Sequence, residues 1–145
     1  MSEDRYGLQR FVDAQEDAAI YARALGELRA GRKQGHWIWF VFPQIAGLGQ
    51  SPMSQAYAIR WLAEARAYLE HPLLGPRLRE CCEALLAVDP ALSAEQILGG
   101  IDAIKVRSCM TLFLRAEPAL QLFQAVLTRF YASEPDPATD RLLGT

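Results

Sequence analysis

Six consecutive apolar residues, Trp37-Ile38-Trp39-Phe40-Val41-Phe42, decide the fold of this 145-residue chain. The stretch has high β propensity. However, no second convincing strand occurs in the sequence, and a lone strand cannot pair its backbone groups. The stretch therefore predicts a short, buried helix that is apolar all round and ends at Pro43. Because each large side chain contributes about 1.5–3 kcal/mol when fully buried, we expect this helix at the centre of the core.

The segments on both sides of this stretch show the apolar repeat of amphipathic helices. Cap and turn residues mark several ends: Gly31 follows one segment, Ser51 and Pro52 open another, and Ser93 begins a capping box. The segment after Ser51 either runs through or breaks near Arg60. The expected helices cover residues 16–30, 37–42, 52–70, 75–88, 93–98, 102–115 and 118–131, with a short helix or turn over 7–15.

These segments predict an all-α fold: a compact multihelical single domain of six to seven helices around one short, fully buried apolar helix. The length fits one domain over residues 1–145. A domain of this size buries about 68–70% of the surface that its unfolded chain exposes, so it needs no disulfide or metal to fold. Residues 133–145 are rich in Pro and Asp, and we expect this tail to dock loosely.

Composition argues against several classes of protein. The net charge of −2 gives no strong positive field, so we expect no nucleic-acid partner. The longest apolar run is far shorter than the about 20 residues that span a membrane, so we expect no membrane partner. An odd number of cysteines, with no C-x-x-C spacing, indicates reduced thiols and a cytoplasmic protein. Two histidines without a Cys/His cluster predict no metal site, and no cofactor is expected.

Polar residues bracket the apolar stretch and could form a ligand site. A lysine and a histidine precede the stretch, and a glutamine follows it. A loop with two glycines then leads to a capped helix start, where backbone N–H groups can approach an anion closely. The lysine would add a full charge and the histidine a titratable one. The candidate ligand-binding residues of this region are Lys33, His36, Gln44, Gly47, Gly49 and Ser51.

A second candidate group lies on the expected helix 102–115. Lys105, Ser108 and Thr111 repeat at intervals of three, so they share one face beside the apolar residues. A half-buried lysine next to hydroxyl groups could bind an anion, or act as a base if burial lowered its pKa. Lys105 and Ser108 therefore join the candidate ligand-binding residues.

A purely structural interpretation competes with the ligand site. Glycines often serve only to make turns, and a serine before a helix often serves only as its cap. His36 and Gln44 could be hydrogen-bonded at the edge of the core, and Ser108 could bond back to its own helix. For most of these residues the structural interpretation is the more common use.

The sequence resembles a family of small bacterial all-helical proteins called domain of unknown function 1810, some members of which are mislabelled calpastatin. The matching motifs span nearly the whole chain. They include Arg10-Phe-Val-Asp-Ala-Gln15, Gly31-Arg-Lys33, His36-Trp-Ile-Trp-Phe-Val-Phe-Pro-Gln44, Gly47-Leu-Gly49, His71-Pro72, Asp102, Lys105, Ser108 and Met110-Thr-Leu-Phe113. The resemblance implies a compact multihelical fold with one buried helix, and it implies no established activity.

Two functions follow as hypotheses. The first is the binding of a small anionic or nucleotide-like ligand in a polar pocket beside the buried helix. The second is a protein-interaction or structural module without a small-molecule site, in which the polar bracket only stabilises the buried helix. Whether the protein is an enzyme stays open, with His36 as the candidate acid or base.

Overall fold

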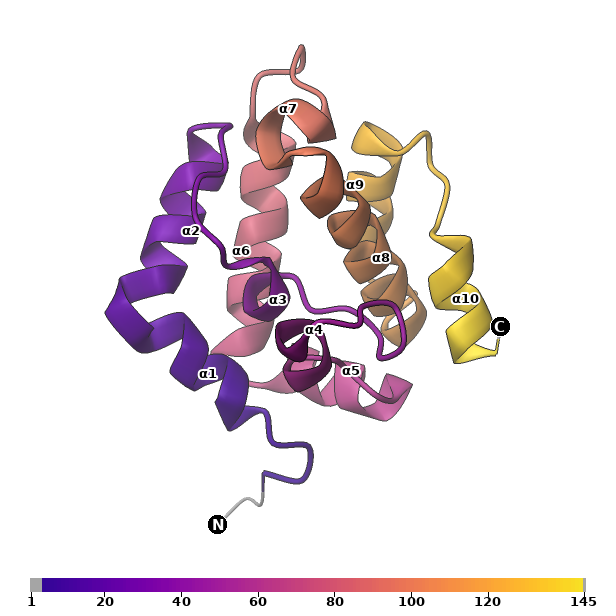
Figure 1. The fold of residues 1–145 in the computed structure, drawn as a ribbon. Coiled ribbons are helices and arrows are strands. Elements are labelled where there is room, and N and C mark those ends of the chain that lie inside the picture. The colour runs from indigo at the N-terminus through magenta and orange to yellow at the C-terminus, as the bar shows by residue number, and fades with distance from the viewer. Residues whose placement is uncertain (1–3, 145) are drawn as a thin grey trace.

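Helices follow one another along residues 4–144, the part of the chain that the computed structural model describes (Figure 1). No strand forms within this range, where a single bridge pairs Ile45 with Ile59. The all-α prediction is therefore confirmed. The α-helices are α1 (Gln9–Glu16), α2 (Ile20–Arg29), α3 (Ile38–Val41), α4 (Pro52–Ala56), α5 (Leu62–Glu70), α6 (Leu74–Ala87), α7 (Ala94–Leu98), α8 (Gly100–Ala116), α9 (Leu122–Phe130) and α10 (Pro137–Leu143).

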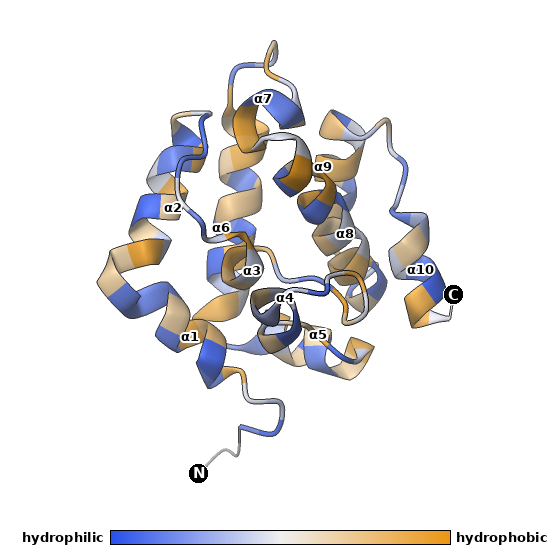
Figure 2. Cartoon of the chain, viewed as in Figure 1, coloured by the Kyte–Doolittle hydropathy of each residue, from blue (hydrophilic) through white to orange (hydrophobic). Residues whose placement is uncertain are grey.

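The longest helix, α8, forms the centre of the fold. All seven residues from 108 to 114 are buried, so this half of α8 is enclosed on every side. Helices α5, α7, α9 and α10 pack against it. The outer helices have one apolar and one polar face, and hydropathy alternates around α2 and α6 in Figure 2. Such stripes are typical of helices that cover a core.

The apolar stretch 37–42 is helical as predicted, but it is a single turn rather than the central element. Trp37 precedes α3 and Phe42 follows it, and every residue except Trp39 is buried. Trp39 is partly exposed, so the expectation of a fully buried helix is wrong at this position. One turn is too short to organise a core of this size, and the seventeen residues of α8 take that place.

Residues 4–144 contain more helices than the six or seven expected, because segment 52–70 divides, the tail forms α10, and the short segment before residue 16 is a helix. The segment 16–30 begins with a 3-10 turn at Asp17–Ala19, where Ala18 and Ala19 have positive φ angles of 51° and 57°. The segment 52–70 divides into α4 and α5 on either side of residues 57–61. Ser51 caps α4 with Pro52 in its first turn, as predicted.

Two helix starts also differ from the prediction. Helix α8 starts at Gly100, two residues before the predicted start at Asp102, which lies inside its first turn. Helix α9 starts at Leu122, four residues after Pro118, because residues 117–121 form a turn instead.

The tail is held more firmly than expected. Asp136 caps α10, with Pro137 in its first turn, and the Thr139 side chain is fully buried. Arg115 of α8 makes a bidentate ion pair with Asp140, with both N···O distances 2.9 Å. These contacts fix α10 on α8, at the right-hand side of Figure 1.

Candidate functional site

A groove lies between the first half of α8, the loop 44–49 and the start of α10. Its volume is about 270 Å³. Four of the eight candidate residues line it, namely Gln44, Gly49, Lys105 and Ser108. The other lining residues are Leu48, Ile101, Ile104, Asp136 and Ala138. We call this feature the α8 groove. Its walls are mainly apolar, and Lys105 is the cation among its lining residues.

Lys33 does not line the α8 groove, and its charge is already neutralised. Its ammonium lies 2.8 Å from one carboxylate oxygen of Asp102 and 4.8 Å from the centre of the Trp37 ring, and it donates to the Gly35 carbonyl. Only 7% of the Lys33 side chain is exposed. Lys105 lies 3.9 Å from the other oxygen of Asp102. Two lysines therefore share one carboxylate, and Lys105 is the more distant of the two partners.

Trp39 lies next to Lys105, although it is not among the residues that line the groove. The Lys105 ammonium is 5.2 Å from the centre of the Trp39 ring. The buried indole N–H of Trp39 has no hydrogen-bond partner among residues 4–144. The side-chain amide of Gln44 also makes no hydrogen bond within that range, although its backbone carbonyl accepts from the Ile59 N–H at 2.8 Å. Leaving a buried donor unpaired costs about 1–3 kcal/mol, so an acceptor at this N–H would be stabilising.

Ser108 serves the fold rather than offering a free hydroxyl. Its Oγ donates to Asp136 at 2.7 Å, and the same carboxylate accepts from the Thr139 hydroxyl at 2.6 Å. Burial acts to raise the pKa of Asp136, but the Thr139 and Ser108 hydroxyls and the backbone N–H groups of Ala138 and Thr139 outweigh it and hold the pKa below its usual range. The negative charge of the groove is thus stabilised by its own neighbours.

Gly47, Gly49 and Ser51 shape the loop as the structural interpretation predicts. Gly47 has a φ angle of +103°, and a Cβ atom there would lie 3.1 Å from the Leu142 side chain of α10. A Cβ atom on Gly49 would lie 2.4 Å from the Ser54 hydroxyl. Ser51 accepts the Ser54 N–H at 3.1 Å and so caps α4. Only Gly49 of these three candidates reaches the groove.

His36 is exposed and lies outside the residues that line the groove. The loop that carries it is held by Glu27, whose Oε1 accepts the N–H groups of Gln34 at 2.7 Å and Gly35 at 2.8 Å and the indole N–H of Trp37 at 2.9 Å. Burial acts to raise the pKa of Glu27, but these donors outweigh it and hold the pKa below its ordinary value.

Two residues of the site were missed by sequence reasoning. Trp39 was assigned to the core because apolar residues surround it on both sides. Asp136 was assigned to the loose tail, although Asp136-Pro137 is the same cap-and-proline pattern that correctly identified the start of α4. That pattern would have predicted α10, and with it one wall of the groove.

The described residues offer no metal-ligand group, no reactive thiol and no helix that could cross a membrane. Residues 4–144 contain no group of three or more His, Cys, Asp or Glu side chains that could hold a metal ion. Cys81, Cys82 and Cys109 are free and buried, and burial raises the pKa of the Cys81 thiol to about 12. None of the helices described combines the length and apolar character that crossing a membrane requires.

Comparison with known proteins agrees with the resemblance seen in the sequence. Residues 5–143 match the family described as "Protein of unknown function (DUF1810)". The chain therefore belongs to this family. It is also similar to the solved crystal structure of the conserved hypothetical protein Rv1873 from Mycobacterium tuberculosis, with 50% sequence identity and a TM-score of 0.93. The similarity covers 98% of this chain and 99% of that chain. No curated protein matches the chain.

Proposed function

We propose that the protein binds a small anionic ligand in the α8 groove, with the negative group at Lys105 and Trp39. The observation that carries the proposal is the buried, unpartnered indole N–H of Trp39, whose ring centre lies 5.2 Å from the Lys105 ammonium. An anionic oxygen would accept this N–H and face the Lys105 ammonium. The free amide of Gln44 adds a third donor on the groove wall.

The remaining walls favour a ligand with an apolar body. Ile104 and Leu48 line the groove, and the carboxylate of Asp136 is engaged by Ser108 and Thr139. In a carboxylate with a short acyl chain, the chain would cover Ile104 and the carboxylate oxygens would face Lys105. The volume of about 270 Å³ is slightly below the usual range for drug-sized ligands, which also favours a compact molecule.

The proposal concerns binding and not catalysis. His36, the candidate acid or base, is exposed and does not line the groove. The Ser108 hydroxyl lies 2.7 Å from the Asp136 carboxylate and 3.2 Å from the Ile104 carbonyl, so its single O–H is taken up by these acceptors. Neither residue is arranged for proton transfer to a ligand in this groove.

The test is a titration with acetate, butyrate, hexanoate and phosphate. Binding is measured by calorimetry and by the change in the indole N–H resonance of Trp39. We expect hexanoate to bind most tightly and to shift that resonance. Lys105→Gln should weaken binding by about tenfold or more, because a hydrogen bond to a charged group contributes about 1.5–3 kcal/mol. Arg32→Gln is the matched control, since Arg32 is an exposed cation outside the groove. If no anion moves the Trp39 resonance, the proposal is wrong.

A protein-interaction module is the second candidate, and one observation favours it. Ile101 and Ile104 are 75% and 67% exposed on neighbouring turns of α8. Side chains of this kind, when clustered, often mark a contact surface. Under this hypothesis Lys105→Gln has no effect on any small anion, and Ile101→Ser with Ile104→Ser abolishes association with the partner while leaving the melting temperature unchanged.

A further inference from the structure

A second pocket, distinct from the α8 groove, lies between the N-terminal segment, residues 55–61 and the first turn of α5. Its volume is about 400 Å³, within the usual range for small-molecule sites. The lining residues that matter for its chemistry are Arg5, Tyr6, Arg10, Arg60, Trp61 and Glu64. We call it the Trp61 pocket.

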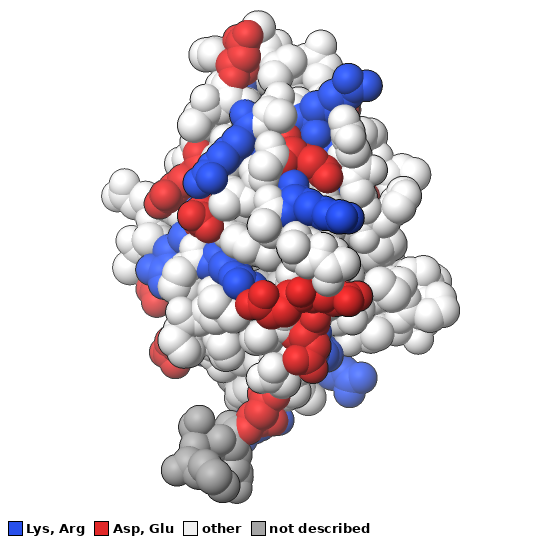
Figure 3. Space-filling model, turned by 90° about the vertical axis from the view of Figure 1, so that its left-hand side faces the viewer, with Lys and Arg blue, Asp and Glu red and all other residues white. Residues whose placement is uncertain are grey.

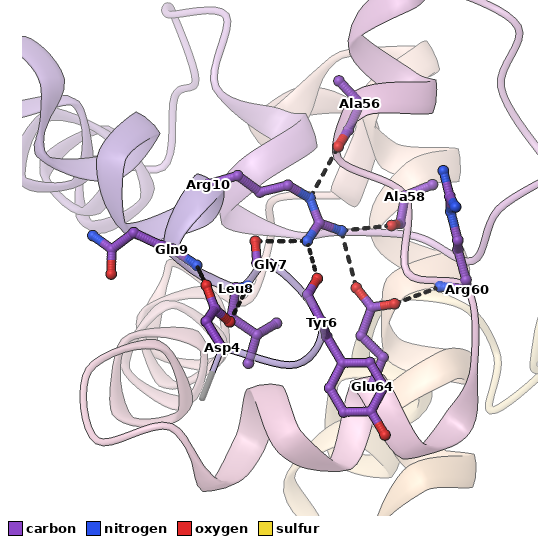
Figure 4. A network of polar contacts seen from close by, with 10 residues as sticks. All are labelled: Asp4, Tyr6, Gly7, Leu8, Gln9, Arg10, Ala56, Ala58, Arg60 and Glu64. Carbon is purple, nitrogen blue, oxygen red and sulfur yellow. Dashed lines mark hydrogen bonds and ion pairs between the residues drawn. The ribbon is translucent and has the colours of Figure 1, made fainter. Parts of the chain in front are cut away.

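The Trp61 pocket has a rigid, electrically neutral floor. An arginine side chain has five N–H donors, and all five of Arg10 are used (Figure 4). They reach the carbonyls of Ala56 and Ala58, the carbonyls of Tyr6 and Gly7, and the carboxylate of Glu64 at 2.9 Å. Arg10 is therefore unavailable to a ligand, and its role is to hold the pocket walls together.

The carboxylate of Glu64 is also fully engaged. Glu64 is 1% exposed. One of its carboxylate oxygens accepts from Arg10, and the other accepts the backbone N–H of Arg60 at 3.0 Å. The Arg60 side chain extends away from this carboxylate in Figure 4. The buried acid thus does not neutralise the Arg60 guanidinium.

Two free guanidinium groups lie on the rim of the Trp61 pocket. Arg5 and Arg60 are exposed, and neither side chain has a hydrogen bond or ion pair within residues 4–144. Within the described residues, these two positive charges therefore have no ion-pair partner, although the whole chain has a net charge of −2. On the face shown in Figure 3, acidic and basic side chains are interspersed, so no strongly positive field covers that face.

An aromatic surface completes the rim. Trp61 is 57% exposed, an unusual degree of exposure for the largest side chain. Its ring packs against Tyr6 with centroids 6.2 Å apart and planes tilted by 49°. A tryptophan held in place by a second ring offers a preformed surface on which a planar group can stack.

We propose that the Trp61 pocket binds a small planar aromatic anion, which stacks on Trp61 and directs its negative group to Arg5 and Arg60. Guanidinium groups bind phosphate and carboxylate through paired hydrogen bonds, and exposed aromatic rings bind bases and similar planar systems. The pocket volume and its confined charge fit a single small molecule rather than a polyanion.

Adenosine 5′-monophosphate and 1-naphthyl phosphate are the probes that test this proposal. Binding is measured by calorimetry and by the indole N–H resonances of the three tryptophans. We expect both probes to shift the Trp61 resonance and not that of Trp39. Adenosine lacks the phosphate, and ribose 5-phosphate lacks the aromatic base. Each should therefore bind at least about tenfold more weakly than adenosine 5′-monophosphate, since each loses one class of interaction.

Matched variants separate this pocket from general charge effects. Arg5→Ala with Arg60→Ala should weaken both probes by about tenfold or more, and Trp61→Ala should do the same. The control is Arg23→Ala with Arg32→Ala, which removes the same charge from exposed positions on and after α2. The arginine variants should keep the wild-type melting temperature, because their side chains are exposed and make no hydrogen bond or ion pair within residues 4–144. Trp61→Ala loses the packing of its ring on Tyr6, so its binding is measured at a temperature where it is folded.

The results that test the Trp61 pocket can be distinguished from the results that test ligand binding in the α8 groove. A shift of the Trp39 resonance without one at Trp61 would place the aromatic anion in the α8 groove and overturn this proposal. If ribose 5-phosphate bound as tightly as adenosine 5′-monophosphate, the pocket would be a general anion site, and the proposal would also be overturned. Absence of binding by both aromatic probes would do the same, whereas the response to hexanoate tests the α8 groove alone.

Discussion

The ammonium of Lys33 lies 2.8 Å from the carboxylate of Asp102, and this ion pair joins the loop after α2 to the first turn of α8. The backbone N–H of Lys33 joins the same loop to α7 by donating to the Ile97 carbonyl at 2.7 Å. The exposed fractions of the two side chains, 7% and 19%, are low enough that solvent screens the pair only in part. Lys33 is therefore a structural residue that positions the helix carrying Lys105.

Lys33→Met should destabilise the protein because it leaves the Asp102 carboxylate without its close partner. We expect a loss of about 2–3 kcal/mol in the free energy of unfolding, since breaking a buried ion pair strands the remaining charge. The double variant Lys33→Met with Asp102→Leu should recover at least about 1 kcal/mol of that loss. Urea denaturation measures both, with Arg32→Met as the exposed control. A double variant as unstable as the sum of its single variants would contradict this account.

Glu27 should make stability depend on pH in the acid range. Because the pKa of Glu27 in the folded protein is lower than its ordinary value of 4.5, protonation favours the unfolded chain. The contribution of the ionised carboxylate is fully present above the ordinary pKa and is lost as the pH falls through the folded one. The stability difference between wild type and Glu27→Gln should therefore shrink below about pH 4.5. Denaturation curves from pH 6 to pH 3 measure it, and a constant difference would count against the role of Glu27.

The turn between α1 and α2 should become more stable with glycine. Ala19 has a φ angle of 57°, a conformation that costs an L-residue about 1–2 kcal/mol but costs glycine little. After allowance for the greater freedom of glycine in the unfolded chain, Ala19→Gly should stabilise the protein by about 0.5–1 kcal/mol. Ala22→Gly, inside α2 and equally exposed, should instead destabilise it by about 1 kcal/mol. Thermal denaturation distinguishes the two, and a common sign would refute the prediction.

These features explain how much of the fold and site could be predicted. The apolar repeats and the caps at Ser51 and Ser93 are local patterns, so the helices that depend on them were found from sequence. The break at Ala18 and Ala19 was missed because nothing in two alanines indicates a left-handed backbone; the packing of α1 and α2 imposes it. The pairing of Lys33 with Asp102 joins residues far apart in sequence, and no local pattern contains that information.

The residues of the two candidate sites were likewise predicted only in part from the sequence. Lys105 and Gln44 were predicted as site residues and do line one groove. Arg5, Arg60 and Trp61 were not predicted, because separate positions along the chain form a pocket only after Arg10 has drawn the N-terminal segment against residues 56–58.

Asp136 should control the docking of α10. Its carboxylate accepts from two hydroxyls and caps the helix, so Asp136→Ala should cost about 2 kcal/mol. Amide exchange in α10 should accelerate more than exchange in α9. The nearby Glu134→Ala is the control, because its ion pair with Arg107 at 3.8 Å involves a side chain that is 76% exposed and should change stability by less than about 0.5 kcal/mol. Unchanged exchange in α10 would show that other contacts hold the tail.

Arg10→Lys should be far from conservative, because the five donors of Arg10 serve five acceptors in a fixed plane. A lysine has three donors and a single charged atom, so carbonyls of the 56–58 segment and the buried Glu64 would lose partners. We expect a loss of about 2–4 kcal/mol in the free energy of unfolding. Arg66→Lys is the matched control, since Arg66 makes one bond, to the Ala116 carbonyl at 3.1 Å, and it should lose less than about 1 kcal/mol.

The same pair of variants links stability to the Trp61 pocket. If the guanidinium of Arg10 sets the spacing between Tyr6 and the 56–58 segment, Arg10→Lys should also weaken the aromatic anions, whereas Arg66→Lys should not. Calorimetry at a temperature where both variants are folded measures this. Retention of full affinity in Arg10→Lys would mean that the walls hold their positions without the network, and that Arg10 contributes to folding alone.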